Sequence, residues 1–128
     1  MVVIDTNILI DYLRQSHKET IFESLLSRYS PDQIYISALT VSELYVGQST
    51  KDKLVKKKVD ALVGSLEVVL IDHLIAKKAG ELTRDYVFLD LNDAFIAATA
   101  IYLKAPLATL NKKHFQGISD LELADLKL

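Results

Sequence analysis

Short apolar runs alternate along the chain with longer segments in which apolar residues recur at helical spacing. Residues 2–4, VVI, are β-branched and too few for an alternating pattern, which is typical of a strand buried in a parallel sheet. The same reasoning predicts strands over three further ranges: 33–37, 67–71 and 107–109. Helices are predicted between the strands over six ranges: 6–14, 18–29, 40–47, 50–65, 72–86 and 93–103. This alternation predicts an α/β sandwich built on a mainly parallel sheet.

The last third of the chain refines this picture. Residues 93–103, DAFIAATAIYL, are apolar on nearly every side and rich in alanine, which predicts a helix buried against the sheet. After them we expect a short turn or helix over 111–115, a break at Gly117 and a last strand near 121–124. The 128 residues contain no visible repeat or linker, so we expect one domain spanning 1–128.

Composition excludes several classes of chemistry. The chain has no cysteine, which rules out disulfides, zinc-thiolate sites, iron-sulfur clusters and a thiol nucleophile. It also lacks the glycine-rich phosphate loops and the GxSxG elbow of common nucleotide-binding and hydrolase folds. The beginning of the chain does not resemble a signal peptide or a membrane span, so we expect a cytoplasmic protein. The net charge of −2 gives no general affinity for nucleic acid, so such a role must come from local placement.

Polar residues gather where the predicted strands end. Asp5 ends the first strand, Glu43 lies in the first turn of the helix after the second, and Asp93 begins the buried helix. Thr109 and Asn111 follow the strand at 107–109. Ligand sites in parallel sheets lie beyond the carboxyl ends of the strands, so all five side chains are candidates for one crevice. Carboxylates that converge without a basic partner are best explained by a divalent cation, and oxygen-only ligands favour Mg²⁺ or Mn²⁺.

An alternative is that each acid only caps a helix. Thr40 and Glu43 have the spacing of a capping box, Asn92 and Asp93 are a good helix-starting pair, and Asp5 is placed to cap the helix that follows it. Capping does not require all three acids to project to the same edge of the sheet, whereas a metal site does.

Basic residues near these acids bear on the substrate. Lys112 and Lys113 follow Asn111 directly, which places them at the rim of the acidic crevice, where a polyanion would enter. Five lysines within 51–58 are interpreted by default as a solvated helix face, with phosphate contact as the less favoured alternative. The histidines lack metal-ligand spacing and are interpreted as single surface residues: His17, His73 and His114.

Four motifs occur in an order and spacing that resemble a known family: VIDTNILIDYL, TVSEL, NDAFIAATA and LATLNKKHF. Together they resemble the PIN-domain ribonucleases, specifically the VapC-like toxins of prokaryotic toxin-antitoxin pairs. The resemblance implies a three-layer α/β/α fold, RNA cleavage that depends on Mg²⁺ or Mn²⁺, a homodimer, and neutralisation by a small antitoxin protein.

The resemblance also assigns roles to residues. By the motifs, the metal-binding and catalytic acids of the family match Asp5, Glu43 and Asp93, and its supporting hydroxyls match Thr6 and Thr109. The fourth acidic position of many members is Asn111 here, which leaves a second metal ion in question. The alternatives are a catalytically weak PIN-like module or a receiver-like Mg²⁺-binding interaction module. A receiver needs a phosphorylatable Asp at the end of a central strand, where this chain offers a lysine-rich helix instead.

The partner surface is predicted from apolar residues in the first helices. The segment 8–26 includes Tyr12 and Phe22 and carries more large apolar residues than two short helices need for a core. We therefore predict a groove there for an amphipathic antitoxin helix, with homodimer packing as the alternative.

Overall fold

The sheet is parallel throughout. The computed structural model describes residues 1–14, 19–47 and 49–126. Four strands lie in the order β3-β2-β1-β4, with every neighbouring pair parallel: β1 (Val2–Ile4), β2 (Ile34–Ser37), β3 (Glu67–Val69) and β4 (Leu107–Ala108). Because all four run in the same direction, their carboxyl ends meet at one edge. The predicted parallel sheet is confirmed.

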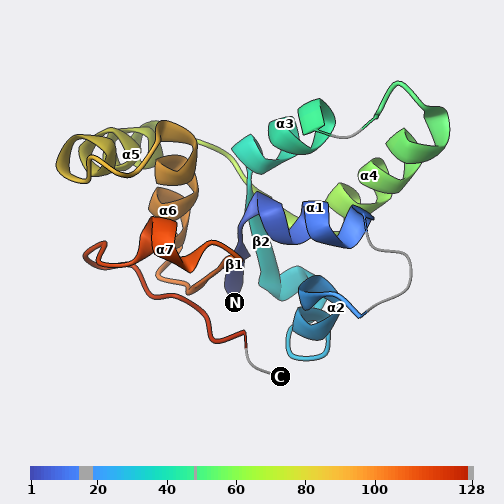
Figure 1. The fold of residues 1–128 in the computed structure, drawn as a ribbon, viewed down its shortest axis with the longest axis horizontal. Coiled ribbons are helices and arrows are strands. Elements are labelled where there is room, and N and C mark those ends of the chain that lie inside the picture. The colour runs from blue at the N-terminus through green and yellow to red at the C-terminus, as the bar shows by residue number, and fades with distance from the viewer. Residues whose placement is uncertain (15–18, 48, 127–128) are drawn as a thin grey trace.

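Helices cover both faces of this sheet (Figure 1). One face carries α1 (Thr6–Arg14), α2 (Ile21–Leu26), α3 (Ala38–Gly47) and α4 (Lys53–Ser65). The other carries α5 (His73–Asp85), α6 (Leu91–Leu103) and α7 (Lys112–Phe115). A short 3-10 helix, η1 (Pro31–Gln33), precedes β2. No helix in the described part of the chain is long and apolar enough to cross a membrane.

The side chains of β1 show how the layers are separated. Val2 and Ile4 belong to the core under α1–α4, whereas Val3 belongs to the core under α5–α7. All three are fully buried, as expected of a central strand whose alternate residues point to opposite faces. The expected three-layer α/β/α sandwich is therefore confirmed.

Several predicted elements are shorter than expected: the strand at 67–71 ends at Val69, and the helix at 50–65 begins at Lys53. The second helix was predicted over 18–29, but in the described residues it begins after Thr20, whose hydroxyl accepts the Glu23 amide at 3.3 Å in a capping box. The predicted strand at 121–124 is reduced to a single parallel bridge between Leu107 and Leu123. Two backbone hydrogen bonds among the described residues join this tail to β4, both made by Leu107: its amide donates to Glu122 and its carbonyl accepts from Ala124.

Candidate active site

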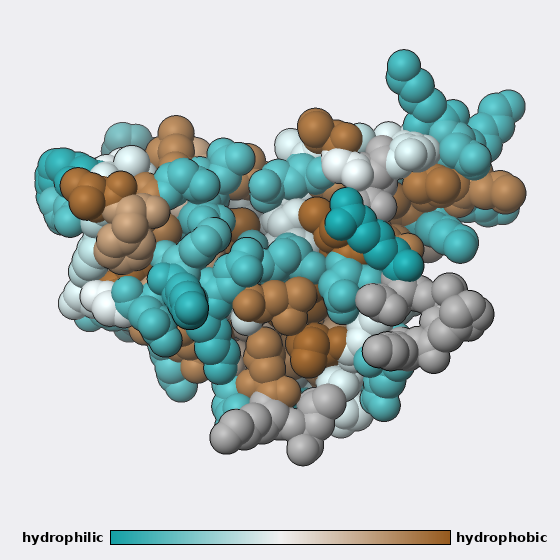
Figure 2. All heavy atoms as spheres, viewed as in Figure 1, coloured by the Kyte–Doolittle hydropathy of each residue, from teal (hydrophilic) through white to brown (hydrophobic). Residues whose placement is uncertain are grey.

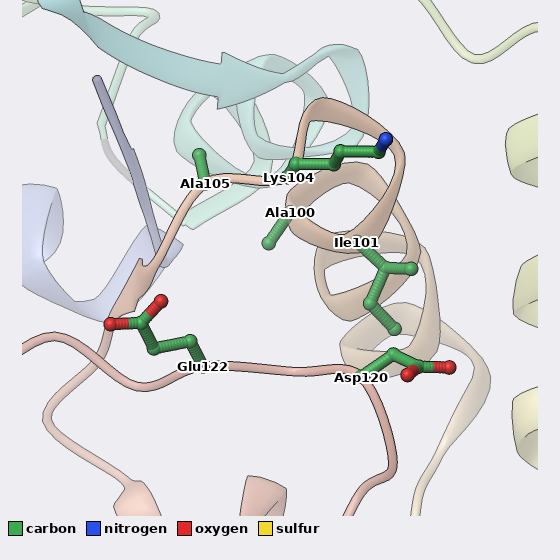
Figure 3. Close-up of a pocket in the computed structure, with 6 residues that line it drawn as sticks. All are labelled: Ala100, Ile101, Lys104, Ala105, Asp120 and Glu122. Atoms are coloured by element: carbon green, nitrogen blue, oxygen red, sulfur yellow. The ribbon is translucent and has the colours of Figure 1, made fainter.

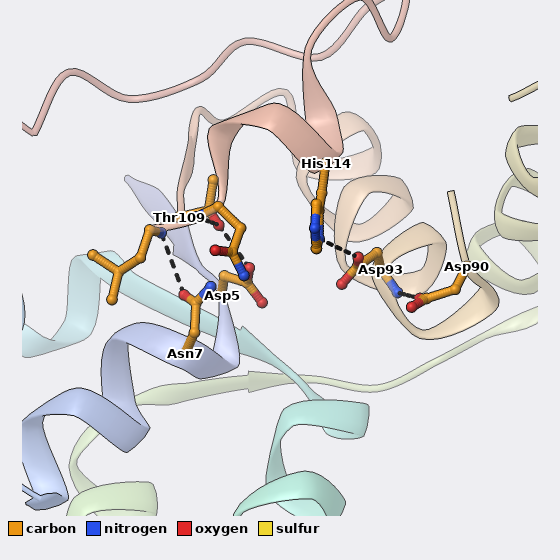
Figure 4. Close-up of polar contacts among 8 residues, drawn as sticks. Asp5, Asn7, Asp90, Asp93, Thr109 and His114 are labelled. Carbon is orange, nitrogen blue, oxygen red and sulfur yellow. Dashed lines mark hydrogen bonds and ion pairs between the residues drawn. The ribbon is translucent and has the colours of Figure 1, made fainter. Parts of the chain in front are cut away.

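The candidate site lies at the edge where β1, β2 and β4 end (Figure 4). Asp5 directly follows β1, α3 starts directly after β2, and Thr109 directly follows β4. The Asp5 amide donates to the carbonyl of Ala108 at 2.9 Å, which keeps the ends of β1 and β4 side by side. Residues 104 positions apart in the sequence are thus brought into contact by strand pairing.

Asp5 is a buried carboxylate. Only 5% of its surface is exposed, and its Oδ2 accepts the hydroxyl of Thr109 at 2.7 Å. Burial raises the pKa of Asp5 to about 6; the Thr109 hydrogen bond opposes this rise, and the nearby charges of Asp93 and Glu43 add to it. Among the described residues, no basic side chain lies within ion-pair distance of Asp5. Its ionised form therefore has no cationic partner in the part of the chain that the structure describes.

Glu43 is positioned by two hydroxyls. Thr6 Oγ1 donates to Glu43 Oε1 at 2.7 Å, and the hydroxyls of Thr6 and Thr40 are 2.9 Å apart. Because the Thr6 proton is committed to the carboxylate, Thr40 donates to Thr6. The proposed capping box of Thr40 and Glu43 is wrong: α3 already begins after Ser37, whose Oγ accepts the amide of Leu39 at 3.1 Å. Glu43 consequently lies in the second turn of α3, not the first.

Asp93 also does not cap its helix. α6 begins at Leu91, and its N-cap is Asp90, whose Oδ1 accepts the Asp93 amide at 2.8 Å. The carboxylate of Asp93 is therefore free to face the site, with 22% of the side chain exposed. Partial burial and the charges of Asp90 and Glu43 raise the pKa of Asp93, while His114 lowers it. The alternative in which Asn92 and Asp93 start the helix as a capping pair is therefore wrong.

His114 was not identified as a site residue from the sequence. It lies on α7, and its Nδ1 is 3.3 Å from Asp93 Oδ2, so the two side chains face each other (Figure 4). His114 is a surface residue, as expected, with 58% of its side chain exposed, but it is not a single residue apart from the acids. His17 lies outside the described residues. One signal was available: His114 stands five positions after Thr109, in the segment that leaves the active edge of the sheet.

The segment after β4 is organised by Thr109. Its Oγ1 accepts the amide of Asn111 at 3.0 Å while donating to Asp5, so one hydroxyl orders both. The Oδ1 of Asn7, which the sequence did not single out, accepts the Leu110 amide at 3.4 Å. Asn111 is exposed and occupies the N-cap of α7 without a side-chain capping bond. Lys112 and Lys113 are exposed and begin α7, the short helix that also carries His114.

The three acids interact through their charges without forming a closed cage. The charge of Glu43 raises the pKa of both Asp5 and Asp93. Within the described ranges, no three His, Asp or Glu side chains are close enough to enclose a metal ion directly. An open set of oxygen donors around a buried, uncompensated carboxylate suits Mg²⁺, which keeps several of its water molecules. The residues present therefore fit a hydrated divalent cation.

A cavity of about 420 Å³ lies at the opposite end of α6 and is separate from this site (Figure 3). It is lined by Ala100, Ile101, Lys104, Ala105, Asp120 and Glu122. Asp93 stands near the start of the 13-residue helix, and the lining residues Ala100 to Lys104 lie about 10 to 16 Å from it along the helix axis. The cavity does not contribute to the acidic cluster.

Comparison with known proteins agrees with this geometry. The PIN domain family model, described as "PIN domain", matches residues 2–121. The chain is 31% identical to Ribonuclease VapC10 of Mycobacterium tuberculosis, over 95% of this chain and 91% of the relative. It is 32% identical to Ribonuclease VapC of Rickettsia bellii, over 99% of this chain and 97% of the relative.

Solved structures show the same fold. A toxin-antitoxin complex from Klebsiella pneumoniae contains a chain that is 29% identical, with a TM-score of 0.81 and coverage of 99% of this chain and 98% of that one. The sequence match extends over nearly the whole chain, as does the match of the fold. This chain therefore belongs to the PIN domain family, in which its similar relatives include VapC ribonucleases.

Proposed function

We propose that this protein is a divalent-metal-dependent endoribonuclease and the toxin of a toxin-antitoxin pair. The observation that carries the proposal is the buried Asp5 carboxylate, which faces two further acids and has no basic partner among the described residues. The names of the relatives, VapC ribonucleases, support the reaction class. Because the proposed substrate is cellular RNA, we also propose that the protein acts in the cytoplasm.

The proposed metal ligands are Asp5, Glu43 and Asp93, directly or through water, with Asn111 as a neutral addition. When bound, Mg²⁺ or Mn²⁺ supplies charge neutralisation and makes water a stronger nucleophile toward the scissile phosphorus. Each acid has its own support: Thr109 holds Asp5, Thr6 holds Glu43, and His114 contacts Asp93. These contacts limit the orientations of the carboxylates before the substrate arrives, which lowers the cost of assembling the site.

We assign the attraction of the RNA substrate to basic residues beside the acidic site. RNA is a polyanion, so the bare acids repel it until the cation offsets their charge. Lys112 and Lys113, at the start of α7, are placed to contact phosphates beside the scissile bond. The protein contributes no covalent nucleophile in this scheme, consistent with the absence of cysteine.

The alternatives are separated by different observations. The match to the PIN domain over residues 2–121 sets aside a receiver-like module. A PIN-like module that binds Mg²⁺ but cleaves weakly differs from the proposed enzyme only in activity, so a cleavage assay decides between them.

The test is cleavage of RNA by the purified chain in Mg²⁺, in Mn²⁺ and in EDTA. Asp5→Asn removes one charge at nearly constant shape and should reduce cleavage by orders of magnitude. Asp120→Asn is the matched control, because it makes the same change at an exposed position whose left-handed φ of 67° suits Asn. Cleavage that persists in EDTA, or in the Asp5→Asn protein, would contradict the proposal.

The antitoxin and homodimer are also proposed. Part of the apolar surface predicted from the sequence serves the domain itself: Phe22 is 2% exposed and its ring lies 4.9 Å from that of Tyr12. Leu26 on α2 remains exposed, as do Val46 on α3 and Leu54 on α4, and the groove at 8–26 stays a prediction. Co-purification with the product of the adjacent gene tests the antitoxin, and the molar mass of the isolated chain in solution tests the homodimer.

A further inference from the structure

Helix α4 presents a dense positive surface outside the site described above. Lys53, Lys56 and Lys57 share one side of the helix, at the i, i+3, i+4 spacing, and all three are exposed. We call these three residues the lysine face of α4. Residues 51–60 hold five lysines and two aspartates, an excess of three positive charges in a chain whose net charge is −2. The opposite side of the helix is anchored in the core by Val59 and Leu62.

Helix stability does not account for these lysines. They lie in the first turns of α4, near the positive end of the helix dipole, where cations are unfavourable. Of these three lysines, only Lys56 has an ion-pair partner among the described residues: Asp60 lies 4.0 Å away, and both side chains are more than half exposed. That pair runs from base to acid along the helix, which is the weaker of the two orders. Asp60 is also engaged by the hydroxyl of Tyr45.

The lysine face is physically connected to the candidate site. α3 starts at the active edge of the sheet and carries Glu43, and α4 packs against α3. The Tyr45–Asp60 hydrogen bond joins the two helices two residues beyond Glu43. Figures 1 and 2 show α3 and α4 forming one arm of the molecule, from which hydrophilic side chains project into solvent. A strand of RNA that leaves the site along α3 would meet α4 next.

We propose that the lysine face of α4 is a second contact surface for the phosphate backbone of the RNA, away from the scissile bond. This inference rests on the proposed ribonuclease function and adds to it a surface that holds the flanking part of the substrate. Charge complementarity carries the choice of partner, since the face has three cations, one weakly paired, and the occupant must be a polyanion. This contact recognises the charge of the phosphates and does not distinguish base sequence.

The size of the effect follows from counterion release. Each phosphate contact to single-stranded nucleic acid contributes about 0.7 to the slope of log affinity against log salt. Loss of three contacts should therefore lower the slope by about 2. When salt rises from about 50 to about 200 mM, the RNA affinity of the unmodified protein should then fall about 20-fold more than that of a variant whose three lysines are neutral. At low salt the neutralised protein should bind more weakly.

The experiment compares two triple variants with the same charge change. In the first, Lys53, Lys56 and Lys57 are each replaced by Gln. The control replaces Lys77, Lys78 and Lys104 by Gln, on α5 and at the end of α6, on the other face of the sheet. Binding is measured by fluorescence anisotropy with a mixed-sequence single-stranded RNA of about 20 nucleotides, longer than the footprint of one small domain. The measurement is made in the Asp5→Asn background, which keeps the RNA intact while Mg²⁺ is present.

The α4 triple variant should show the smaller salt slope, and in the active background a raised KM with little change in kcat. The control should keep the slope of the unmodified protein, and circular dichroism should show that both variants are folded. Equal salt slopes for the two triple variants would overturn the inference. So would an α4 triple variant that binds RNA like the unmodified protein and is weakened only in binding an acidic protein partner. If the unmodified protein neither binds nor cleaves RNA, the proposed function itself fails, which is a distinguishable result.

Discussion

Replacing Asp5 by Asn should stabilise the metal-free protein while abolishing its chemistry. Burial holds the pKa of Asp5 at about 6 against its ordinary 3.8, a difference worth about 3 kcal/mol at about 1.4 kcal/mol per pH unit. The amide keeps an oxygen that can accept the Thr109 hydroxyl, but its two N–H donors need new partners in a buried position. We therefore expect a net gain of about 1–2 kcal/mol near pH 8, or about 3–10 °C in Tm.

The gain should depend on pH in a defined direction. Between the unfolded value of 3.8 and the folded value of about 6, the folded state binds more protons than the unfolded state. Asp5 thus destabilises the wild-type protein fully above about pH 6, and this penalty disappears as the pH falls toward 3.8. The advantage of the Asn variant should shrink over the same window. Asp93, whose pKa is also raised, contributes a slope of the same sign in both proteins.

The assay is urea unfolding of both proteins in EDTA at several pH values from about 8 to about 4.5, with Asp120→Asn as the control for a simple loss of charge. Adding Mg²⁺ should then stabilise the wild-type protein and have much less effect on the Asp5→Asn variant, because the metal binds the folded state through this carboxylate. An Asn variant that is less stable than wild type at pH 8 without metal, or an advantage that does not change with pH, would refute this reasoning.

Three further predictions concern the residues around the acids. His114→Ala should raise the Mg²⁺ concentration needed for thermal stabilisation by about 10-fold, because Asp93 loses the side chain that orients it; an unchanged titration would show the contact to be incidental. Asn111→Asp should lower the Mg²⁺ concentration for half-maximal cleavage, since it adds a charge beside the metal site, whereas superimposable curves would mean that position 111 only orders the backbone. Thr40→Val should cost about 1–2 kcal/mol of stability and reduce cleavage, because Thr6 loses its buried donor and holds Glu43 less firmly; a stability loss with full activity would leave Thr40 a purely structural role.

The sequence determined the layout of the domain and the edge at which chemistry is placed. Its strand-helix alternation predicted a parallel sheet, and in such a sheet residues that follow strands must meet at one edge. This local rule put Asp5 and Thr109 together although 104 positions separate them, and their hydrogen bond is 2.7 Å long. The apolar, alanine-rich segment 93–103 likewise predicted a helix buried on the sheet, which is α6.

Tertiary packing decided which polar groups cap helices and which face the site. Ser37 and Asp90, rather than Thr40 and Asn92, start α3 and α6, although all four residue types are favoured at helix starts. The Thr6–Thr40 pair and the contact of His114 with Asp93 join residues 34 and 21 positions apart. Such contacts depend on how each helix is rotated about its axis against the sheet. The burial of a whole apolar face sets that rotation, so local spacing along the sequence does not specify the contacts.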